Sequence, residues 1–124
     1  MILMYTSSGS RSCRKARKYL RDNNLPYVER DILRDEISEA EIRYLLKRSE
    51  NGTDDIISDR SKTIREGGVD VSSMRFSELV KFVLKNPDIL KRPIILDQNS
   101  IMTGYDEEEI SIFTRRNHQP LQLV

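Results

Sequence analysis

The sequence predicts one α/β domain, in which a βαβ segment and a ββα segment share a sheet and a helical segment is inserted between them. Its 124 residues suit a single domain, and 37% apolar residues are enough for a modest core. Strand and helix patterns alternate at both ends of the chain, whereas the middle shows mainly helical patterns. We therefore expect a core formed by residues 1–33 and 88–124 and a helical insertion at residues 34–87.

The first 33 residues predict the βαβ segment. Residues 2–5 form a short apolar strand, and a small polar loop follows. A helix is expected over residues 11–23, because Cys13, Ala16 and Leu20 recur at helical spacing. Leu25-Pro26 ends it, and residues 27–32 alternate as a second strand. The two strands should be parallel, with a right-handed crossover.

The insertion contains two clear helical patterns. Ser38 and Glu41 are spaced as a capping box, and the helix that they begin should end near Glu50-Asn51-Gly52. The second helix should stop at Asn86-Pro87. Its buried stripe is expected to comprise Phe76, Leu79, Val80, Val83 and Leu84.

The last third of the chain predicts the ββα segment. Pro93 precedes an apolar strand at residues 94–97, a turn at 98–100 and a returning strand at 101–103. The last helix should be capped by Asp106 with Glu109. A βαβ segment followed by a ββα segment is the thioredoxin arrangement.

Charge is unevenly distributed although the formal net charge is only +1. Residues 11–21 contain six Lys and Arg residues and no acid, whereas residues 29–59 contain ten acids and five bases. These stretches are either ordinary solvated helix faces or a bipolar surface, with one end for an anion or nucleic acid and the other for a basic partner. The basic helix alone does not predict a free-standing DNA-binding protein, because no helix-turn-helix pattern or zinc-ligand spacing accompanies it.

Cys13 is the only cysteine, so no internal disulfide can form. A lone thiol, no leader sequence and no apolar stretch near the ~18 residues of a membrane span predict a cytoplasmic protein without membrane contact. Cys13 falls in the first helical turn, where backbone N–H groups and nearby arginines favour a reactive thiol; alternatively it fills the helix–sheet interface. The preceding serines and glycine suit an oxyanion. Arg92-Pro93 is either a cis pair that brings Arg92 beside Ser10 and Cys13, or simply the start of an edge strand.

The chain resembles the arsenate reductase/Spx family, and more closely its Spx branch of transcription regulators. The resemblance covers nearly the whole chain. It is carried by Tyr5-Thr6-Ser7, Ser12-Cys13-Arg14-Lys15-Ala16-Arg17, Glu50-Asn51-Gly52-Thr53-Asp54-Asp55-Ile56-Ile57-Ser58, Arg60-Ser61-Lys62, Arg92-Pro93-Ile94-Ile95 and Gly104-Tyr105-Asp106-Glu107-Glu108-Glu109-Ile110.

The resemblance implies a thioredoxin-like core that lost its enzymatic role and binds the C-terminal domain of the RNA polymerase α subunit. Gly52 matches the glycine at that polymerase contact; from the sequence alone it is either an interface residue or only a helix C-cap. Arg92 matches the arginine beside the redox turn, and Arg60 matches an arginine important for activity. Promoter DNA would be contacted only within the polymerase complex. Clp protease is a further candidate partner through a tail of relatives, although this sequence ends at Val124.

Two departures from the family pattern argue against arsenate reduction, and a third changes the loop before the first helix. Ser10 replaces the first cysteine of the usual Cys-x-x-Cys, which is also where arsenate reductases place their nucleophile. Tyr105 stands where arsenate reductases have a third arginine, and Ser8-Gly9 replaces the usual Pro-Ser. We therefore expect a non-enzymatic regulator without a cofactor, a bound metal or an internal redox switch. Its redox and anion pocket would comprise Ser10, Cys13, Arg60 and Arg92. The alternatives are a monothiol oxidoreductase that uses Cys13, and a scaffold that occupies the α subunit and blocks other activators.

Overall fold

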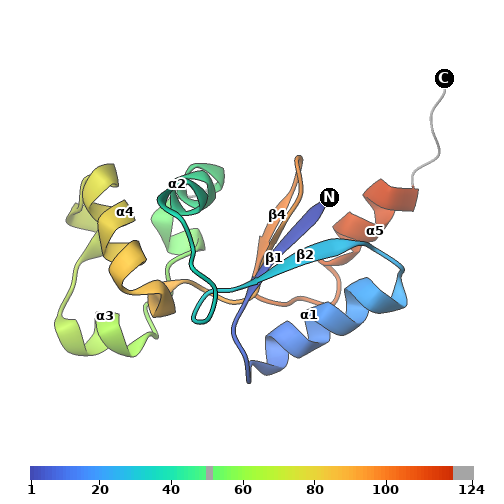
Figure 1. Ribbon diagram of the computed structural model, residues 1–124, viewed down its shortest axis with the longest axis horizontal. Coiled ribbons are helices and arrows are strands. Elements are labelled where there is room, and N and C mark those ends of the chain that lie inside the picture. The colour runs from blue at the N-terminus through green and yellow to red at the C-terminus, as the bar shows by residue number, and fades with distance from the viewer. Residues whose placement is uncertain (50–51, 119–124) are drawn as a thin grey trace. The chain divides into compact units, whose positions relative to one another are not determined.

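A computed structural model describes residues 1–49 and 52–118 of the chain. Figure 1 shows a small sheet with α-helices. The described residues also form three short 3₁₀ turns, named η below. The elements follow in the order β1 (Ile2–Thr6), α1 (Arg11–Asp22), β2 (Tyr27–Asp31), α2 (Glu39–Arg48), η1 (Thr53–Asp55), α3 (Lys62–Gly67), η2 (Val71–Ser73), α4 (Phe76–Lys85), η3 (Pro87–Ile89), β3 (Ile94–Leu96), β4 (Ile101–Thr103) and α5 (Ser111–His118).

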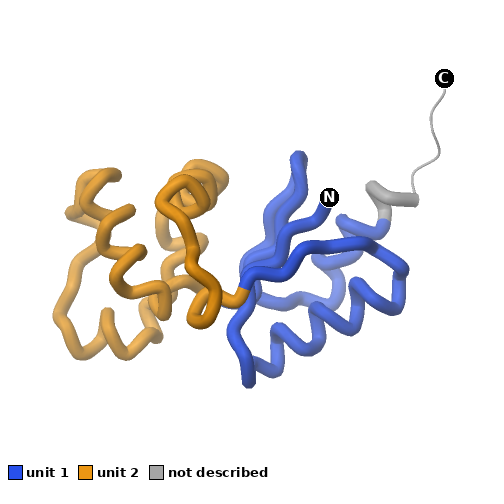
Figure 2. The backbone as a smooth tube through the Cα atoms, viewed as in Figure 1, with its two compact units in different colours: residues 1–30, 92–124 blue, residues 31–91 orange. Residues whose placement is uncertain are grey.

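The chain divides into two compact units, which Figure 2 distinguishes by colour. Unit 1 comprises residues 1–30 together with the chain from Arg92 onward, and unit 2 comprises residues 31–91. Unit 1 contains β1, α1, β3, β4, α5 and nearly all of β2, and unit 2 contains the remaining helices. Each unit is described separately below.

The sheet of unit 1 contains four strands among the described residues, in the order β2-β1-β3-β4. β1 and β2 run in the same direction (Figure 1), as expected for a βαβ segment. β3 is antiparallel to both β1 and β4, with Met4 opposite Ile95 and Ile95 opposite Met102. The β3–β4 turn is stabilised by the Asp97 carboxylate, which accepts the N–H groups of Asn99 and Ser100 at 2.9 and 2.8 Å. The expected hairpin and α/β class are confirmed.

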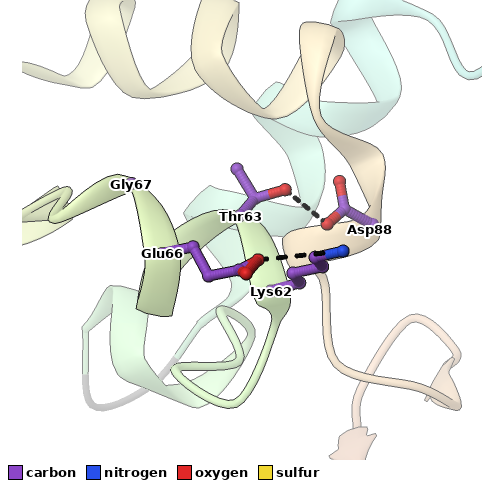
Figure 3. A pocket seen from close by; sticks show the side chains of 5 residues that line it. All are labelled: Lys62, Thr63, Glu66, Gly67 and Asp88. Atoms are coloured by element: carbon purple, nitrogen blue, oxygen red, sulfur yellow. Dashed lines mark hydrogen bonds and ion pairs between the residues drawn. The ribbon is translucent and has the colours of Figure 1, made fainter.

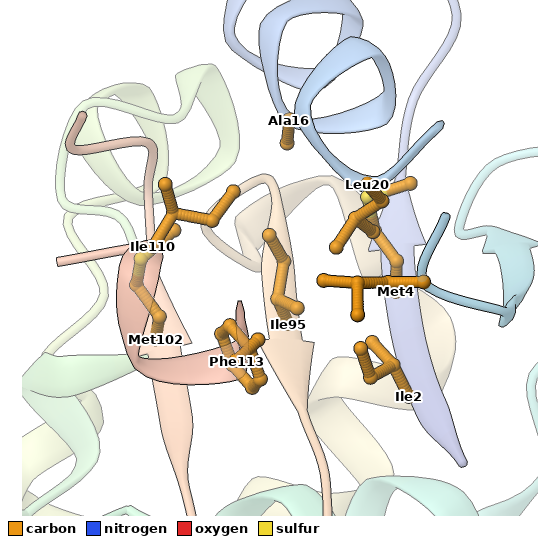
Figure 4. Packing of buried hydrophobic residues seen from close by; sticks show 9 residues of the cluster. Ile2, Met4, Ala16, Leu20, Ile95, Met102, Ile110 and Phe113 are labelled. Atoms are coloured by element: carbon orange, nitrogen blue, oxygen red, sulfur yellow. The ribbon is translucent and has the colours of Figure 1, made fainter. Parts of the chain in front are cut away.

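One face of this sheet carries the core of unit 1. The directly opposed Met4, Ile95 and Met102 share that face, and each is at most 1% exposed. Helices α1 and α5 cover the row: Figure 4 shows Ala16 and Leu20 of α1, and Phe113 of α5, directed toward these strand residues. The hydroxyls of Tyr19 and Thr114 form a hydrogen bond between the two helices. The three- and four-residue spacing of the buried residues of α1 therefore produces the helix–sheet contact that the sequence predicts.

A polar contact joins α1 to two strands of the same unit. The Arg17 guanidinium donates two hydrogen bonds to the Glu29 carboxylate of β2, at 2.9 and 2.6 Å. The Thr6 hydroxyl, at the end of β1, donates to the same carboxylate at 2.7 Å. The Arg17 hydrogen bond lowers the pKa of Glu29; partial burial opposes this shift, and the Thr6 hydrogen bond adds to it. The carboxylate therefore holds α1, β1 and β2 together in its charged form.

The helices of unit 2 partly differ from expectation. The capping box of Ser38 and Glu41 at α2 is confirmed, and so is the end of α4 at Asn86. Phe76, expected in the buried stripe of α4, is 40% exposed instead, because it is the first residue of the helix and lies under the Arg43 guanidinium, 5.6 Å from the ring centre. α3 is a helix of six residues, too short and too polar for hydrophobic periodicity to reveal it.

The beginning of α5 was predicted too early. The Asp106 carboxylate does accept the N–H groups of Glu108 and Glu109, at 2.9 and 2.8 Å, as expected for a capping residue. Residues 107–110 nevertheless form a turn, and the N–H groups of Ser111 and Ile112 bond three residues back rather than four. The regular helix therefore begins at Ser111. No helix within residues 1–49 and 52–118 is long and apolar enough to cross a membrane.

The Arg17–Glu29 contact predicts a pH-dependent stability. Glu29→Gln should lower the free energy of unfolding at pH 7 by roughly 1–2 kcal/mol, because Arg17 loses a charged, partly buried partner. The folded-state pKa of Glu29 lies below its unfolded value of about 4.3, so the stabilisation is present above that pH and disappears as pH falls through the folded pKa. Urea unfolding at pH values from 7 to 3 should show that the difference in free energy of unfolding between wild type and Glu29→Gln becomes smaller as the pH falls.

The matched control is Glu39→Gln on α2, which removes an exposed i,i+4 pair with Arg43. Such pairs contribute only about 0.3–0.5 kcal/mol. Equal losses of stability in the two variants, or a Glu29→Gln gap independent of pH, would contradict the role given to Glu29.

Candidate functional site

Ser10 builds the start of α1. It is the N-cap residue, with extended backbone, and its side-chain oxygen accepts the N–H of Cys13 at 3.2 Å. Its carbonyl accepts the N–H of Arg14 at 3.1 Å, which begins the helical hydrogen-bond series. Serine is among the best N-cap residues because its short side chain reaches these otherwise unpaired N–H groups. The residue that replaces the first cysteine of the Cys-x-x-Cys pattern therefore has a structural role of its own.

Cys13 is the third residue of α1 and is 0% exposed. It lies on the same buried face of the helix as Ala16 and Leu20, as the spacing predicts. Of the two sequence interpretations, the structure favours the cysteine that fills the interior, because a thiol without solvent exposure is not accessible to a substrate or an oxidant.

The two arginines of the predicted pocket belong to different units. Arg92 is half-buried in unit 1, and the Arg92–Pro93 peptide bond is cis, as one of the two sequence interpretations expects. Pro93 is fixed to the end of the hairpin, because its carbonyl accepts the N–H of Gly104 at 2.8 Å. Arg60 is exposed, in the turn of unit 2 that leads into α3. The structure brings Ser10 and Cys13 together by a hydrogen bond; a pocket that also includes Arg60 and Arg92 stays a prediction.

Tyr105 stands in the place of the third arginine and does not replace its charge. The side chain packs partly buried against the core of unit 1. Burial raises the pKa of Tyr105, and the carboxylates of Glu107 and Asp106 act in the same direction. The hydroxyl is therefore neutral at physiological pH, and an oxyanion would find no positive charge there.

Gly52 does not cap α2. The helix ends at Arg48, and Ser49 is its C-cap. The Ser49 hydroxyl donates to the Gly52 carbonyl at 2.7 Å, so this side chain organises the exit from the helix. Glu50 and Asn51, part of the motif that carried the prediction, lie outside the described residues. Gly52 precedes η1 and its carbonyl accepts the N–H of Asp55 at 3.1 Å.

The backbone of Gly52 is exposed and has φ +96° and ψ −178°. This region of the Ramachandran plot is essentially restricted to glycine. A Cβ atom added at Gly52 would meet nothing within 4 Å, so the space above the backbone is open. Backbone conformation, and not neighbouring atoms, therefore requires glycine at this position, and a partner can approach the chain closely here.

Two exposed aromatic side chains of unit 2 are paired with arginines, a feature that hydrophobic periodicity did not reveal. Tyr44 of α2 is 49% exposed, and the Arg48 guanidinium lies 5.5 Å from its ring centre and donates to its hydroxyl at 2.6 Å. Phe76 and Arg43 form the second pair. The i,i+4 spacing of Tyr44 and Arg48 was the available signal. Since Arg48 is the last residue of α2, the first pair ends four residues before Gly52.

A surface hollow in unit 2, shown in Figure 3, is not a candidate catalytic site. It is lined by Lys62, Thr63, Glu66, Gly67 and Asp88. The Thr63 hydroxyl donates to Asp88 at 2.7 Å, and the Lys62 ammonium lies 3.9 Å from the Glu66 carboxylate. These side chains are paired with one another, and the Thr63–Asp88 bond joins α3 to η3. Within the described part of the chain, no cluster of three or more His, Cys, Asp or Glu residues suits a metal ion.

Comparison with known proteins gives consistent matches. The model of the ArsC family matches residues 5–113. A protein named global transcriptional regulator Spx from Listeria innocua is 43% identical over 123 residues, which cover 99% of this chain and 94% of that protein. The protein of the same name from Staphylococcus aureus is 42% identical over 123 residues, which again cover 99% of this chain and 94% of that protein.

Solved structures give the same fold at lower identity. An arsenate reductase from Vibrio cholerae is 14% identical, with a TM-score of 0.71 over 92% of this chain and 95% of that one. A structure described as a "possible arsenate reductase" from Streptococcus mutans is 21% identical, with a TM-score of 0.76 over 90% and 98%. At these identities the likeness shows the fold, which confirms the thioredoxin-like α/β class.

The burial of Cys13 predicts slow thiol chemistry. In the native protein a disulfide reagent should modify Cys13 at least about 100-fold more slowly than in denaturant, because the thiol is reached only through local opening. Diamide should produce no intramolecular disulfide, as read by intact mass under non-reducing conditions. Ser10→Cys is the positive control, since it restores the Cys-x-x-Cys spacing and should give such a disulfide. Rapid modification of native wild type would contradict the assignment of Cys13 to the interior.

Proposed function

The chain belongs to the ArsC family, within its branch of Spx transcription regulators, and from this premise we propose that it binds the C-terminal domain of the RNA polymerase α subunit through a surface that includes Gly52. Relatives more than 40% identical over nearly the whole chain are named global transcriptional regulators, and the chain is a regulator of that type. In this proposal it redirects transcription under stress, acts in the cytoplasm and engages promoters only as part of the polymerase complex.

The observation that carries the proposal is the geometry at Gly52. An interface glycine is useful where the partner packs directly on the backbone, and such a position needs exposure, open space and a conformation that excludes other residues. Gly52 has all three properties. The helix C-cap interpretation no longer accounts for this glycine, because Ser49 occupies the C-cap position of α2.

The residues before Gly52 support a protein partner. Interfaces are enriched in Tyr and Arg, and their hot spots are often these two residue types. Tyr44 and Arg48 contact each other on the exposed side of α2, so their side chains are already partly ordered before a partner binds. We include both in the proposed surface.

A monothiol oxidoreductase that uses Cys13 is the weaker alternative. Such an enzyme needs an accessible thiolate, whereas Cys13 is 0% exposed and the first position of the pattern is Ser10. Sulfate-like ions can still be attracted to the start of α1 and to Arg92, but attraction of an anion does not supply a nucleophile. The scaffold alternative shares the same surface, and only transcription assays separate it from an activator.

The decisive variants are Gly52→Ala and Gly52→Arg, compared on the same preparations. Both introduce a Cβ atom at φ +96°, so both should lose stability by about 1–3 kcal/mol. Only arginine adds bulk and charge above the surface. We expect similar melting temperatures for the two variants, and α-subunit binding by calorimetry at least about 10-fold weaker for Gly52→Arg than for Gly52→Ala. A folded Gly52→Arg protein that binds the α subunit as tightly as Gly52→Ala would remove Gly52 from the surface.

Enzymatic activity is tested separately. Arsenate reduction coupled to glutathione and glutaredoxin should not exceed a blank without protein, because position 10 carries a hydroxyl and Tyr105 carries no charge. Cys13→Ala is the matched variant and should give the same rate as wild type. Turnover above the blank that disappears in Cys13→Ala would support the oxidoreductase instead.

A further inference from the structure

The solvent face of α1 is a stripe of positive charge. Five cations of this helix are exposed, namely Arg11, Arg14, Lys15, Lys18 and Arg21. At about 100° per residue they fall within an arc of roughly 120°, opposite the buried face of the same helix. We call these five residues the basic stripe.

Most of this charge has no acid to neutralise it. Asp22 is the only acid in α1, and it bonds the Lys18 ammonium at 2.7 Å. Arg17 lies beside the stripe and is committed to Glu29. Arg11, Arg14 and Lys15 form no ion pair with any residue that the structure describes. The basic stripe is therefore an uncompensated field over the first half of the helix.

The position of these cations is unfavourable for the helix itself. The N-terminal end of a helix carries partial positive charge and is stabilised by acids. α2 follows this rule, with Glu39 and Glu41 in its first turn and basic residues in its last, whereas the first turn of α1 contains no acid. Cations at this end of a helix destabilise the folded state, so their placement here indicates a function other than stability. A bound polyanion would reverse the sign of this interaction.

The composition of the stripe points to phosphates and not to a protein. Protein interfaces are centred on aromatic residues, Met and Arg and are depleted in lysine. The basic stripe contains arginine but no aromatic residue or Met, and two of its five residues are lysines. Contacts to a phosphate backbone require only Arg and Lys. From Arg11 to Arg21 the helix rises about 15 Å, a length that spans several phosphates of a duplex, because each strand carries one charge per 3.4 Å of the duplex axis.

We propose that the basic stripe of α1 binds the phosphate backbone of duplex DNA without reading its sequence. The biological use rests on the proposed function, since a regulator held on the polymerase α subunit would bring the stripe to promoter DNA. Contacts of this kind add affinity and steer approach, but they do not choose the promoter.

The test measures fluorescence anisotropy of a labelled 24-base-pair duplex with the full chain, without polymerase, between 25 and 150 mM salt. The variant is R11Q/R14Q/K15Q, in which glutamine keeps helix propensity. We expect binding at low salt for wild type, weakened at least about 10-fold in the variant. The slope of log K against log salt should fall by about 0.9 per lost contact. A second duplex of unrelated sequence should give the same values.

The matched control is R34Q/K81Q/K85Q, which removes three exposed cations of unit 2 and changes the net charge equally. Its affinity and salt slope should equal those of wild type. Absence of wild-type binding at 25 mM salt, equal losses in both triple variants, or polyglutamate competing as well as unlabelled duplex would each overturn the proposal, the last in favour of an acidic protein.

Failure of this proposal is distinguishable from failure of the proposed function. R11Q/R14Q/K15Q should bind the isolated α-subunit domain as wild type does, whereas Gly52→Arg should bind free DNA normally and lose the α subunit. If the triple variant loses α-subunit binding as well, while its melting temperature is unchanged, the stripe belongs to the protein interface and the DNA assignment is wrong.

Discussion

β1 pairs with β3 in antiparallel register, and this pairing holds the chain from residue 6 to residue 93 as one closed loop. Closing a loop of that length is entropically costly, so the contact must be supported by burial. The row of Met4, Ile95 and Met102 provides this burial, and α1 and α5 cover the same face of the sheet. Without the row, these helices would have no surface to pack on, and Ser10, Cys13 and Arg92 would lose their common framework.

The parts of the structure that follow from local rules were predictable from sequence. The inward face of α1, the capping box of α2 and the hairpin turn at Asp97 all depend on residues within a few positions of one another. The errors occurred where a neighbour further away, or a side-chain competitor, decided the outcome. Phe76 is exposed beside Arg43 of another helix, and α2 ends at Arg48 with Ser49 as its C-cap, before the glycine that was expected to end it.

The candidate site was predictable to a similar extent. The sequence identified Ser10 and Cys13 as neighbours at the start of a helix, and Gly52 as a position that needs a positive φ. Only the burial of Cys13 in the structure favoured its role as an interior residue over that of a reactive thiol. Arg60 was chosen through family resemblance, and Arg92 through that resemblance and the Arg92-Pro93 pattern. Among the described residues, no hydrogen bond or ion pair joins either arginine to Ser10 or Cys13. Tyr44 was not identified from the sequence, because an exposed aromatic residue is not part of the periodic pattern of buried residues from which the helices were predicted.

The Ser10 cap also bears on how such a regulator is controlled. Many sensors carry information in their chemical state, and two cysteines in one turn are a compact way to store one bit. Here the first position of the Cys-x-x-Cys pattern holds the Ser10 hydroxyl, engaged in a helix cap, and the second holds the Cys13 thiol inside the protein. A turn with a single, buried thiol cannot close a disulfide on itself, so oxidation cannot change the covalent connectivity of the chain at this place.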